Sequence, residues 1–334
     1  MTTWLITGFG GMLGRDLADL LTSQGERIVG YARAGLDITD PAAVQAALER
    51  DRPQVVVNCA AWTAVDDAEA HEDSALAVNG HAVGYLAAAC AARDAALVQV
   101  STDYVFDGQA AKPYPEDHPA APRSAYGRTK LAGERAALAT LPDAVYIVRT
   151  AWLYGAHGRN FVATMLGRAR AGQPSSVVDD QRGQPTWTSD VASQIHALIA
   201  TGAPTGTYHA TSSGETTWYG LAREVYARAG ADPALVTPTT TEAFPRPAPR
   251  PAYSVLGHSA WAAAGIQPIG DWLDALDRAF PAIAATALAG LAAKLPGVRR
   301  AALVLRQLAR AQCLVQRRCL RILGRQDRPA VDTV

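Results

Sequence analysis

Residues 4–14 read Trp-Leu-Ile-Thr-Gly-Phe-Gly-Gly-Met-Leu-Gly, in which a short apolar run passes directly into a glycine-rich turn. The apolar run is typical of a buried strand, and a helical pattern begins at Met12. Gly8, Gly11 and Gly14 permit a tight turn and a close approach of the backbone to a ligand, so that a pyrophosphate can lie on the helix N-terminus. The stretch therefore predicts a Rossmann-type dinucleotide-binding unit.

Short apolar runs alternate with longer Ala- and Leu-rich helical patterns along the rest of the chain. This alternation predicts an α/β fold, with a doubly wound parallel sheet built from βαβ units. Thr39-Asp40-Pro41 marks one helix start, because a capping side chain precedes Pro at the first helical position. The predicted strands are residues 4–7, 28–31, 55–58, 97–101, 145–149 and 207–210. The other predicted helices are residues 41–50, 74–92, 160–171, 190–200 and 218–229, and one around residues 126–130.

The alternation loosens after Arg149, and this divides the chain into three predicted parts. Residues 1–150 are predicted to form an NAD(P)-binding Rossmann domain, and residues 151–280 a smaller substrate-binding lobe, partly interleaved with the sheet. The Pro-rich residues 237–251 are predicted to be an extended loop. Residues 281–334 are Ala- and Arg-rich, with apolar residues on one helical stripe and arginines on the opposite side, which predicts a basic amphipathic helix.

Composition favours a small-molecule partner. The 334 residues carry a formal net charge of zero, so no global field attracts nucleic acid. The four cysteines lack any C-x-x-C pair, which predicts a reducing cytoplasm rather than a disulfide framework or a zinc site. The N-terminus enters a strand almost at once, so we expect no secretory signal. No apolar run reaches the ~20 residues that span a bilayer.

Three side chains are candidates for carbonyl chemistry. Tyr126 and Lys130 lie four residues apart, on one face of the predicted helix. A free phenol titrates near pH ~10, and a fixed Lys charge is expected to lower that pKa toward the working range, so Tyr126 is the predicted acid for a nascent alkoxide. Thr102 ends a strand, where open parallel sheets bind ligands, and is predicted to hydrogen-bond the reacting carbonyl. Its hydroxyl also suits a local backbone cap.

The residues after the second strand leave the choice of cofactor open. Asp37 would bond the ribose hydroxyls of NADH, whereas Arg33 would neutralise the extra phosphate of NADPH. After the third strand, Ala60 and Ala61 are small enough for a flat ring or a phosphate to lie against the backbone. We therefore predict a cofactor wall at residues 58–63.

Longer segments resemble the extended short-chain dehydrogenase/reductases, and among them the dTDP-4-dehydrorhamnose reductase family, over about residues 2–280. The segments that carry the resemblance are Thr7–Gly14, Val57–Ala61, Thr63–Asp66, Ser101–Phe106, Tyr126–Gly133, Arg149–Tyr154, Asp179–Gln181 and Pro245–Arg250. The resemblance implies that a nicotinamide delivers hydride to the C4 ketone of dTDP-4-dehydro-L-rhamnose, while Tyr126 protonates the oxygen. It also implies that Thr102 orients and polarises the ketone and that Lys130 holds the nicotinamide ribose.

The same resemblance and the glycine motif define the expected contact residues. Those expected at the cofactor are Gly8, Gly11, Met12, Leu13, Gly14, Arg33, Asp37, Ile38, Ala60, Ala61, Trp62, Tyr126 and Lys130. Those expected at the sugar are Thr63, Val65, Thr102, Asp103 and Trp152. Candidates for the nucleotide end of the substrate are Gln181, Trp187, Trp218 and Arg250, because a diphosphate needs cationic or amide donors and a thymine favours an aromatic face. These four residues also suit a structural role in the lobe.

Alternatives stay open for both the activity and the tail. The chain could serve another nucleotide-linked deoxysugar as reductase or epimerase. It could also be a non-catalytic NADP-binding regulatory subunit, which the intact Thr102, Tyr126 and Lys130 disfavour. Some relatives are described as binding Mg²⁺ at a dimer interface, but no acidic ligand set here matches it. The basic tail suits a helix on anionic lipid, a self-association helix in a homodimer, or an extension with few constraints.

Overall fold

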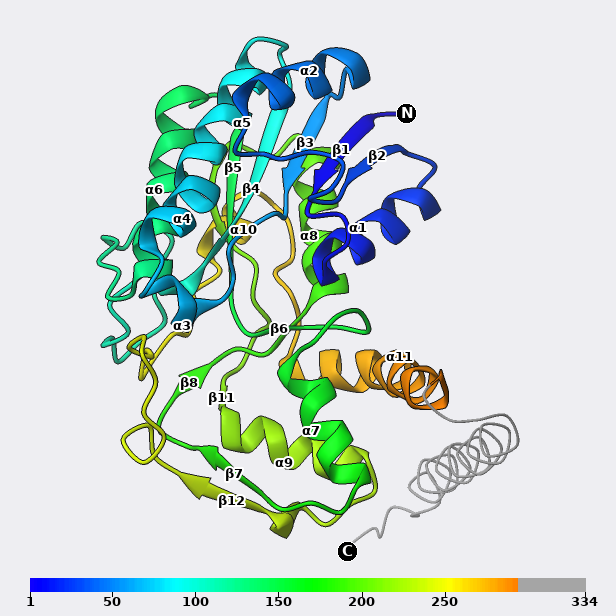
Figure 1. Cartoon of the computed structure of the whole chain (residues 1–334), viewed down its shortest axis with the longest axis vertical. Helices are drawn as coiled ribbons and strands as arrows, with labels where there is room; N and C mark the ends of the chain where they lie inside the picture. The colour runs from blue at the N-terminus through cyan, green and yellow to red at the C-terminus, as the bar shows by residue number, and fades with distance from the viewer. Residues whose placement is uncertain (294–334) are drawn as a thin grey trace, which may run out of the picture. The chain divides into compact units, whose positions relative to one another are not determined.

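Six parallel strands form the central sheet of the computed structural model, which describes residues 1–293 (Figure 1). Their order is β10-β5-β4-β3-β1-β2, and every neighbouring pair is parallel. The strands are β1 (Thr3–Thr7), β2 (Arg27–Tyr31), β3 (Val55–Asn58), β4 (Ala96–Thr102), β5 (Val145–Thr150) and β10 (Gly206–His209). The chain leaves β1 toward β2 on one side and reaches β3 on the other, so the strand order reverses at β1. The predicted doubly wound α/β fold is confirmed.

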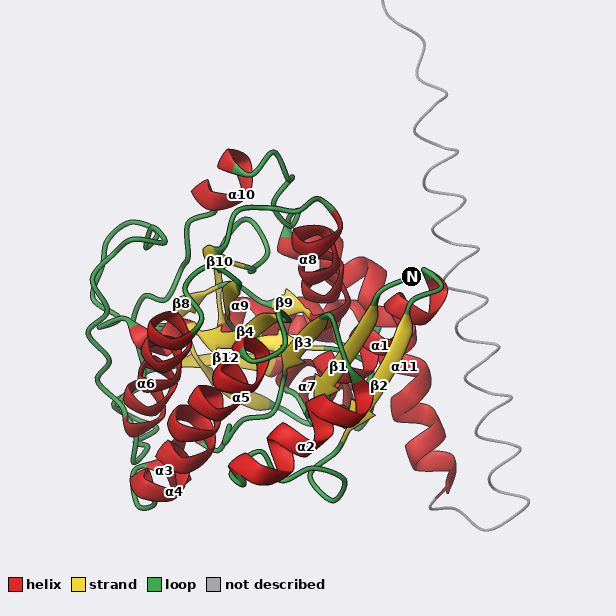
Figure 2. Cartoon of the chain, turned by 90° about the horizontal axis from the view of Figure 1, so that it is seen from above, coloured by secondary structure: helices red, strands yellow, loops and turns green. Residues whose placement is uncertain are grey.

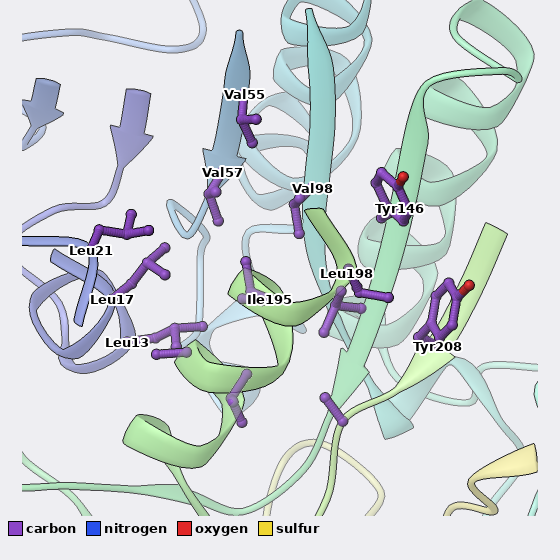
Figure 3. Close-up of a cluster of buried hydrophobic side chains, with 14 of the residues drawn as sticks. Leu13, Leu17, Leu21, Val55, Val57, Val98, Tyr146, Ile195, Leu198 and Tyr208 are labelled. Atoms are coloured by element: carbon purple, nitrogen blue, oxygen red, sulfur yellow. The ribbon is translucent and has the colours of Figure 1, made fainter. Parts of the chain in front are cut away.

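Helices cover both faces of this sheet (Figure 2). On one face lie α1 (Met12–Ser23) and α8 (Thr188–Ala200), and on the other lie α2 (Pro41–Asp51), α5 (Ala82–Ala91) and α6 (Ala125–Thr140). Figure 3 shows how leucines of α1 meet Ile195 and Leu198 of α8 over Val57 and Val98 of the sheet. Leu48 and Leu86 fill the opposite face. Because both faces of the sheet are covered, the inner strands β1 and β3 are buried along their whole length, whereas the edge strand β2 is partly exposed.

Local signals fix the helix starts, and one predicted helix contains a wider turn. Asp40 caps α2 by accepting from the amides of the first turn, as expected from the Thr-Asp-Pro sequence. The long helix predicted over residues 74–92 is confirmed as helical over residues 72–91, in which a π turn (Ala77–His81) joins α4 (Glu72–Leu76) to α5. The wider turn places the Asn79 side chain against the backbone of Trp62, with hydrogen bonds of 2.8 and 3.1 Å.

The second half of the chain adds short paired strands and helices. The pairs are β6 (Leu153–Tyr154) with β9 (Thr186–Trp187), β7 (Ser175–Val178) with β12 (Val236–Thr239), and β8 (Arg182–Gly183) with β11 (Thr216–Thr217). The remaining helices are α3 (Val65–Ala68), α7 (Phe161–Arg170), α9 (Trp218–Arg228), α10 (Ser259–Ala263) and α11 (Trp272–Ala293), with 3₁₀ turns at Asp103–Val105 and Pro233–Leu235. Residues 237–239 were predicted to be loop, but they pair with β7.

The structure bears differently on the predicted divisions near residues 150 and 281. Residues 1–283 form one compact unit, and the division of this unit near residue 150 stays a prediction. The change of composition at Pro281 falls inside α11 rather than at its end. The amphipathic helix predicted after residue 300 lies outside the described residues. Among residues 1–293, no helix is both long and apolar enough to cross a membrane.

Candidate active site

A cavity of about 960 Å³ lies where the carboxyl ends of the parallel strands meet. The last residues of five strands line it: Thr7, Tyr31, Asn58, Thr102 and Thr150. Open α/β sheets bind ligands at this edge, next to the point where the strand order reverses. All thirteen residues predicted to contact the cofactor line this one cavity.

The glycine turn shapes the end of the cavity beside α1. Gly8 has a φ of +63°, and a Cβ there would lie 2.6 Å from the backbone of Cys59 and Ala60, so a side chain is excluded. Gly11 is the N-cap of α1, and no side chain satisfies the first amides of that helix. Free amides together with the helix dipole fit an anion, so the turn suits the diphosphate of a dinucleotide.

Two opposite charges line the cavity after β2. The Asp37 carboxylate accepts hydrogen bonds from the Thr39 amide (3.0 Å) and hydroxyl (2.7 Å), and these bonds hold the pKa of Asp37 below its usual value. Within residues 1–293, no hydrogen bond or ion pair engages the Arg33 guanidinium, although its charge acts on Asp37. Of these two side chains, Arg33 is therefore the one that is available to bind an additional phosphate.

The predicted catalytic residues meet at the centre of the cavity. Ser124 caps α6 through the Gly127 amide (3.1 Å) and so fixes the helix that carries Tyr126 and Lys130. Lys130 is 4% exposed, and its Nζ donates to the Val100 carbonyl at 2.6 Å. Tyr126, Lys130 and Thr102 all face the same space.

Thr102 takes the capping role that its position suggested, and its role at a reacting carbonyl stays a prediction. Its hydroxyl donates to Asp103 Oδ1 (2.9 Å) and accepts from the Tyr104 amide (3.2 Å), so it caps the short 3₁₀ turn. It also lowers the pKa of the neighbouring Tyr126 phenol. Its single proton points to Asp103 in this arrangement, so polarising a ketone requires the hydroxyl to turn.

Burial controls the protonation of the central pair. It raises the pKa of Tyr126 to about 12, and the hydrogen bond with Thr102 opposes this increase. It lowers the pKa of Lys130 to about 8, and the charge of Glu134 opposes this decrease. The expected lowering of the Tyr126 pKa by Lys130 is thus wrong, because burial raises this pKa and Thr102, not Lys130, is the group that opposes the increase. Tyr126 therefore keeps its proton at neutral pH, as a proton donor must.

Glu134, which lies on α6 itself, and Asn79, which lies on the π turn, anchor the catalytic helix to its surroundings and were not identified from the sequence. Glu134 is 2% exposed, and its carboxylate accepts from Ser101 and, at 2.7 and 3.0 Å, from Arg149. Asn79 bonds both Trp62 and, at 3.2 Å, the Thr129 hydroxyl on α6. The presence of an acidic residue one helical turn after Lys130 was a sequence signal that could have identified Glu134. No local sequence signal identifies Asn79, because its contacts depend on the π turn.

An aromatic plate forms the substrate side of the cavity. The Trp152 ring stacks on Trp218 with centroids 3.7 Å apart, and Trp152 holds a left-handed φ of +49° that costs free energy for a side chain of this size. Gly183 makes room for that ring, because a Cβ there would lie 2.5 Å from it. Beyond the plate, Asp103 is buried, Oδ2 has no hydrogen-bond partner among the described residues, and burial raises its pKa to about 6.

Most of the predicted substrate residues line the cavity, but three do not. The residues in place are Thr63, Val65, Thr102, Asp103, Trp152 and Trp218. Gln181 instead donates to the Thr241 hydroxyl at 2.9 Å, and Arg250 pairs with Asp66 at 2.8 Å. Trp187, a further candidate, faces the Arg278 guanidinium outside the cavity. Contact of these three with the nucleotide end of a substrate stays a prediction.

Comparisons with known proteins show the family to which the chain belongs. The family model described as "RmlD substrate binding domain" matches residues 1–284. A dTDP-4-dehydrorhamnose reductase of Streptomyces griseus is 56% identical over 284 residues, covering 84% of this chain and 93% of the relative. A probable dTDP-4,6-dihydroxy-2-methyloxan-3-one 4-ketoreductase of Streptomyces antibioticus is 53% identical, covering 90% and 99%. The NADP complex of dTDP-4-dehydrorhamnose reductase from Bacillus anthracis is similar in structure, with a TM-score of 0.81, 36% identity, and coverage of 84% and 99%.

Proposed function

Because the chain belongs to the RmlD substrate binding domain family, we propose that it reduces the C4 ketone of dTDP-4-dehydro-L-rhamnose to give dTDP-L-rhamnose. The observation that carries the proposal is the cavity, in which a diphosphate-binding turn, Thr102, Tyr126 and Lys130 face one another. A relative 56% identical over most of both chains bears the name of this activity. The reaction is the last step in making an activated deoxysugar for polysaccharides.

A nicotinamide cofactor supplies hydride when bound, and the chain's own residues supply the rest. The amides at the start of α1 bind its diphosphate, and Ala60 and Ala61 leave room for a flat ring. Tyr126 holds a proton at its phenol oxygen and gives it to the ketone oxygen as charge develops there. The Lys130 ammonium would stabilise the phenolate that remains, and it would also hold the nicotinamide ribose.

We propose NADPH rather than NADH as the preferred cofactor. Arg33 carries the charge that an adenosine 2′-phosphate needs, and within residues 1–293 its guanidinium has no hydrogen-bond partner. Asp37 already accepts two hydrogen bonds from Thr39. The NADP complex of the Bacillus anthracis relative supports the same choice. Within residues 1–293, no group of three or more His, Cys, Asp or Glu side chains is placed to hold a metal, and Mg²⁺ has no part in the proposal.

A second candidate keeps the chemistry and changes the sugar. The Streptomyces antibioticus relative is named as a ketoreductase for a different dTDP-linked sugar, and it is nearly as similar to this chain. The two activities require the same acid and the same cofactor, and they differ only in how the sugar meets the Trp152 plate and Asp103. Comparing kcat/KM for the two sugars distinguishes them.

The decisive experiment follows oxidation of NADPH with dTDP-4-dehydro-L-rhamnose, comparing the wild-type chain with Tyr126→Phe. We expect the variant to lose about 100- to 10,000-fold in kcat, because a positioned general acid contributes that much. Titration with NADPH is the control, and its Kd should change little. Absence of oxidation by the wild-type chain would contradict the proposed activity and favour a regulatory subunit. Full activity of Tyr126→Phe would contradict only the choice of acid.

A further inference from the structure

Residues 155–160 connect β6 to α7 and lie against the first turns of α1 (Figure 1). The Asn160 side-chain amide is 3.6 Å from the Met12 sulfur. A Cβ at Gly158 would lie 3.3 Å from Met12 Cγ. His157 Nε2 is 3.7 Å from a carboxylate oxygen of Asp16, one turn further along α1. A segment far away in the sequence is thus held beside the glycine turn.

Buried contacts hold residues 155–160 in place. The Thr188 hydroxyl at the start of α8 donates to Asp16 Oδ2 at 2.5 Å and lies 3.2 Å from the Tyr154 carbonyl. Thr188 is fully buried, so α1, α8 and β6 meet at one side chain. The Asn160 amide also bonds the Gly155 carbonyl at 3.0 Å and closes the segment on itself. The position of the segment is therefore set by packed elements.

Arg159 extends from this segment and lines the cavity. The cationic side chains among the lining residues are Arg33, Lys130 and Arg159. Lys130 bonds the Val100 carbonyl in the interior, and Arg33 follows β2. Arg159 is exposed, and within residues 1–293 no hydrogen bond or ion pair engages it. Among the lining cations it is the one whose neighbours contact the start of α1, and Arg15 of that helix lies outside the lining.

We propose that Arg159 binds the diphosphate of the dinucleotide cofactor, so that residues 155–160 complete the site that the glycine turn begins. A diphosphate carries two negative charges, and a guanidinium can bind its oxygens with paired hydrogen bonds. The sugar nucleotide also contains a diphosphate, but the contacts of the neighbouring residues are with Met12 and Asp16 of α1. This inference takes from the proposed function only that the cofactor is a nicotinamide dinucleotide.

The test measures the Kd of NADPH and of NADH by fluorescence titration, with no sugar present. Arg159→Ser should raise both values by the same factor, on the order of tenfold, because both cofactors share the diphosphate. Arg33→Ser should raise the value for NADPH alone. Arg159→Lys should keep part of the affinity, since it keeps the charge. Arg15→Ser is the matched control, because Arg15 is exposed on α1 outside the cavity, and it should change neither value.

Two outcomes would overturn the assignment. One is an unchanged Kd for both cofactors in Arg159→Ser. The other is a rise confined to the KM of the sugar nucleotide, which would place Arg159 at the diphosphate of the substrate. Because the titration needs no sugar, a wild-type chain that binds NADPH tightly but reduces no sugar would contradict the proposed activity and leave this inference standing.

Discussion

Lys130 is placed so that small changes in its surroundings decide whether it is charged. Burial lowers its pKa to about 8, and it must be protonated to stabilise the Tyr126 phenolate. Because the pKa of Tyr126 is raised to about 12, the phenol keeps its proton throughout the neutral range. We therefore expect kcat/KM, which reports the free enzyme, to fall as the pH rises through about 8. A profile of kcat/KM against pH checks this.

The same profile tests the role of Glu134. Its negative charge raises the pKa of Lys130, so Glu134→Gln should move the fall in kcat/KM to lower pH. Ser101→Ala removes a hydrogen bond to the Glu134 carboxylate but keeps the charge of that carboxylate. The midpoint of the pH profile should therefore be unchanged in Ser101→Ala. Breaking the buried pair with Arg149 is expected to cost ~3–5 kcal/mol of stability, but partial unfolding lowers the height of the profile and not its midpoint. An unmoved midpoint in Glu134→Gln would contradict the electrostatic role.

At the scale of elements, the sequence predicts whatever is encoded within one short segment. The glycine turn, the Asp40 cap and the spacing of Tyr126 and Lys130 are local, and the structure contains all three. The helix over residues 72–91 was predicted from its pattern, but the π turn within it was not, because its Asn79 bonds Trp62, a partner 17 residues earlier in the chain that no local pattern indicates.

The candidate site shows the same limit. Residues on the glycine turn and at strand ends were predicted to line the cavity, because topology alone brings strand ends together. Gln181 and Arg250 were proposed from residue type, which does not determine partners, and the structure gives them Thr241 and Asp66. Arg159 was not identified, because its place depends on how residues 155–160 pack on α1.

Asn79 provides a prediction about the π turn. Asn79→Ala removes hydrogen bonds to Trp62 and Thr129 from a buried site, so we expect a loss of ~1–3 kcal/mol in stability. Because Trp62 lines the cavity, the KM for NADPH should rise as well. Asp232→Ala is the control, since Asp232 caps the 3₁₀ turn at Pro233–Leu235 through the Ala234 amide (2.9 Å), and neither it nor its sequence neighbours line the cavity. Denaturant unfolding and steady-state kinetics measure both quantities. Equal KM values in the two variants would show that Asn79 serves stability alone.

At the scale of the molecule, a single sheet edge collects groups from distant parts of the sequence. The residues that line the cavity run from Thr7 to Trp218, and all lie in the compact unit 1–283. The first strands supply the diphosphate-binding turn, the middle of the chain supplies Tyr126 and Lys130, and Trp152 and Trp218 form the plate opposite them. Binding of a cofactor therefore links the two halves of the chain, and it should raise the stability of the whole unit by mass action.

We expect the activity to depend on the compact unit and not on residues 294–334. A chain that ends after Ala293 should keep kcat and KM within about twofold of the full chain, because the residues of the cavity and of the described core lie before that point. The interpretations of the basic tail differ in their other effects. Flotation with anionic vesicles that is lost on truncation would support lipid binding, and a decrease in oligomer size by gel filtration would support self-association. A large loss of kcat in the truncated chain would contradict the prediction and assign the tail a part in catalysis.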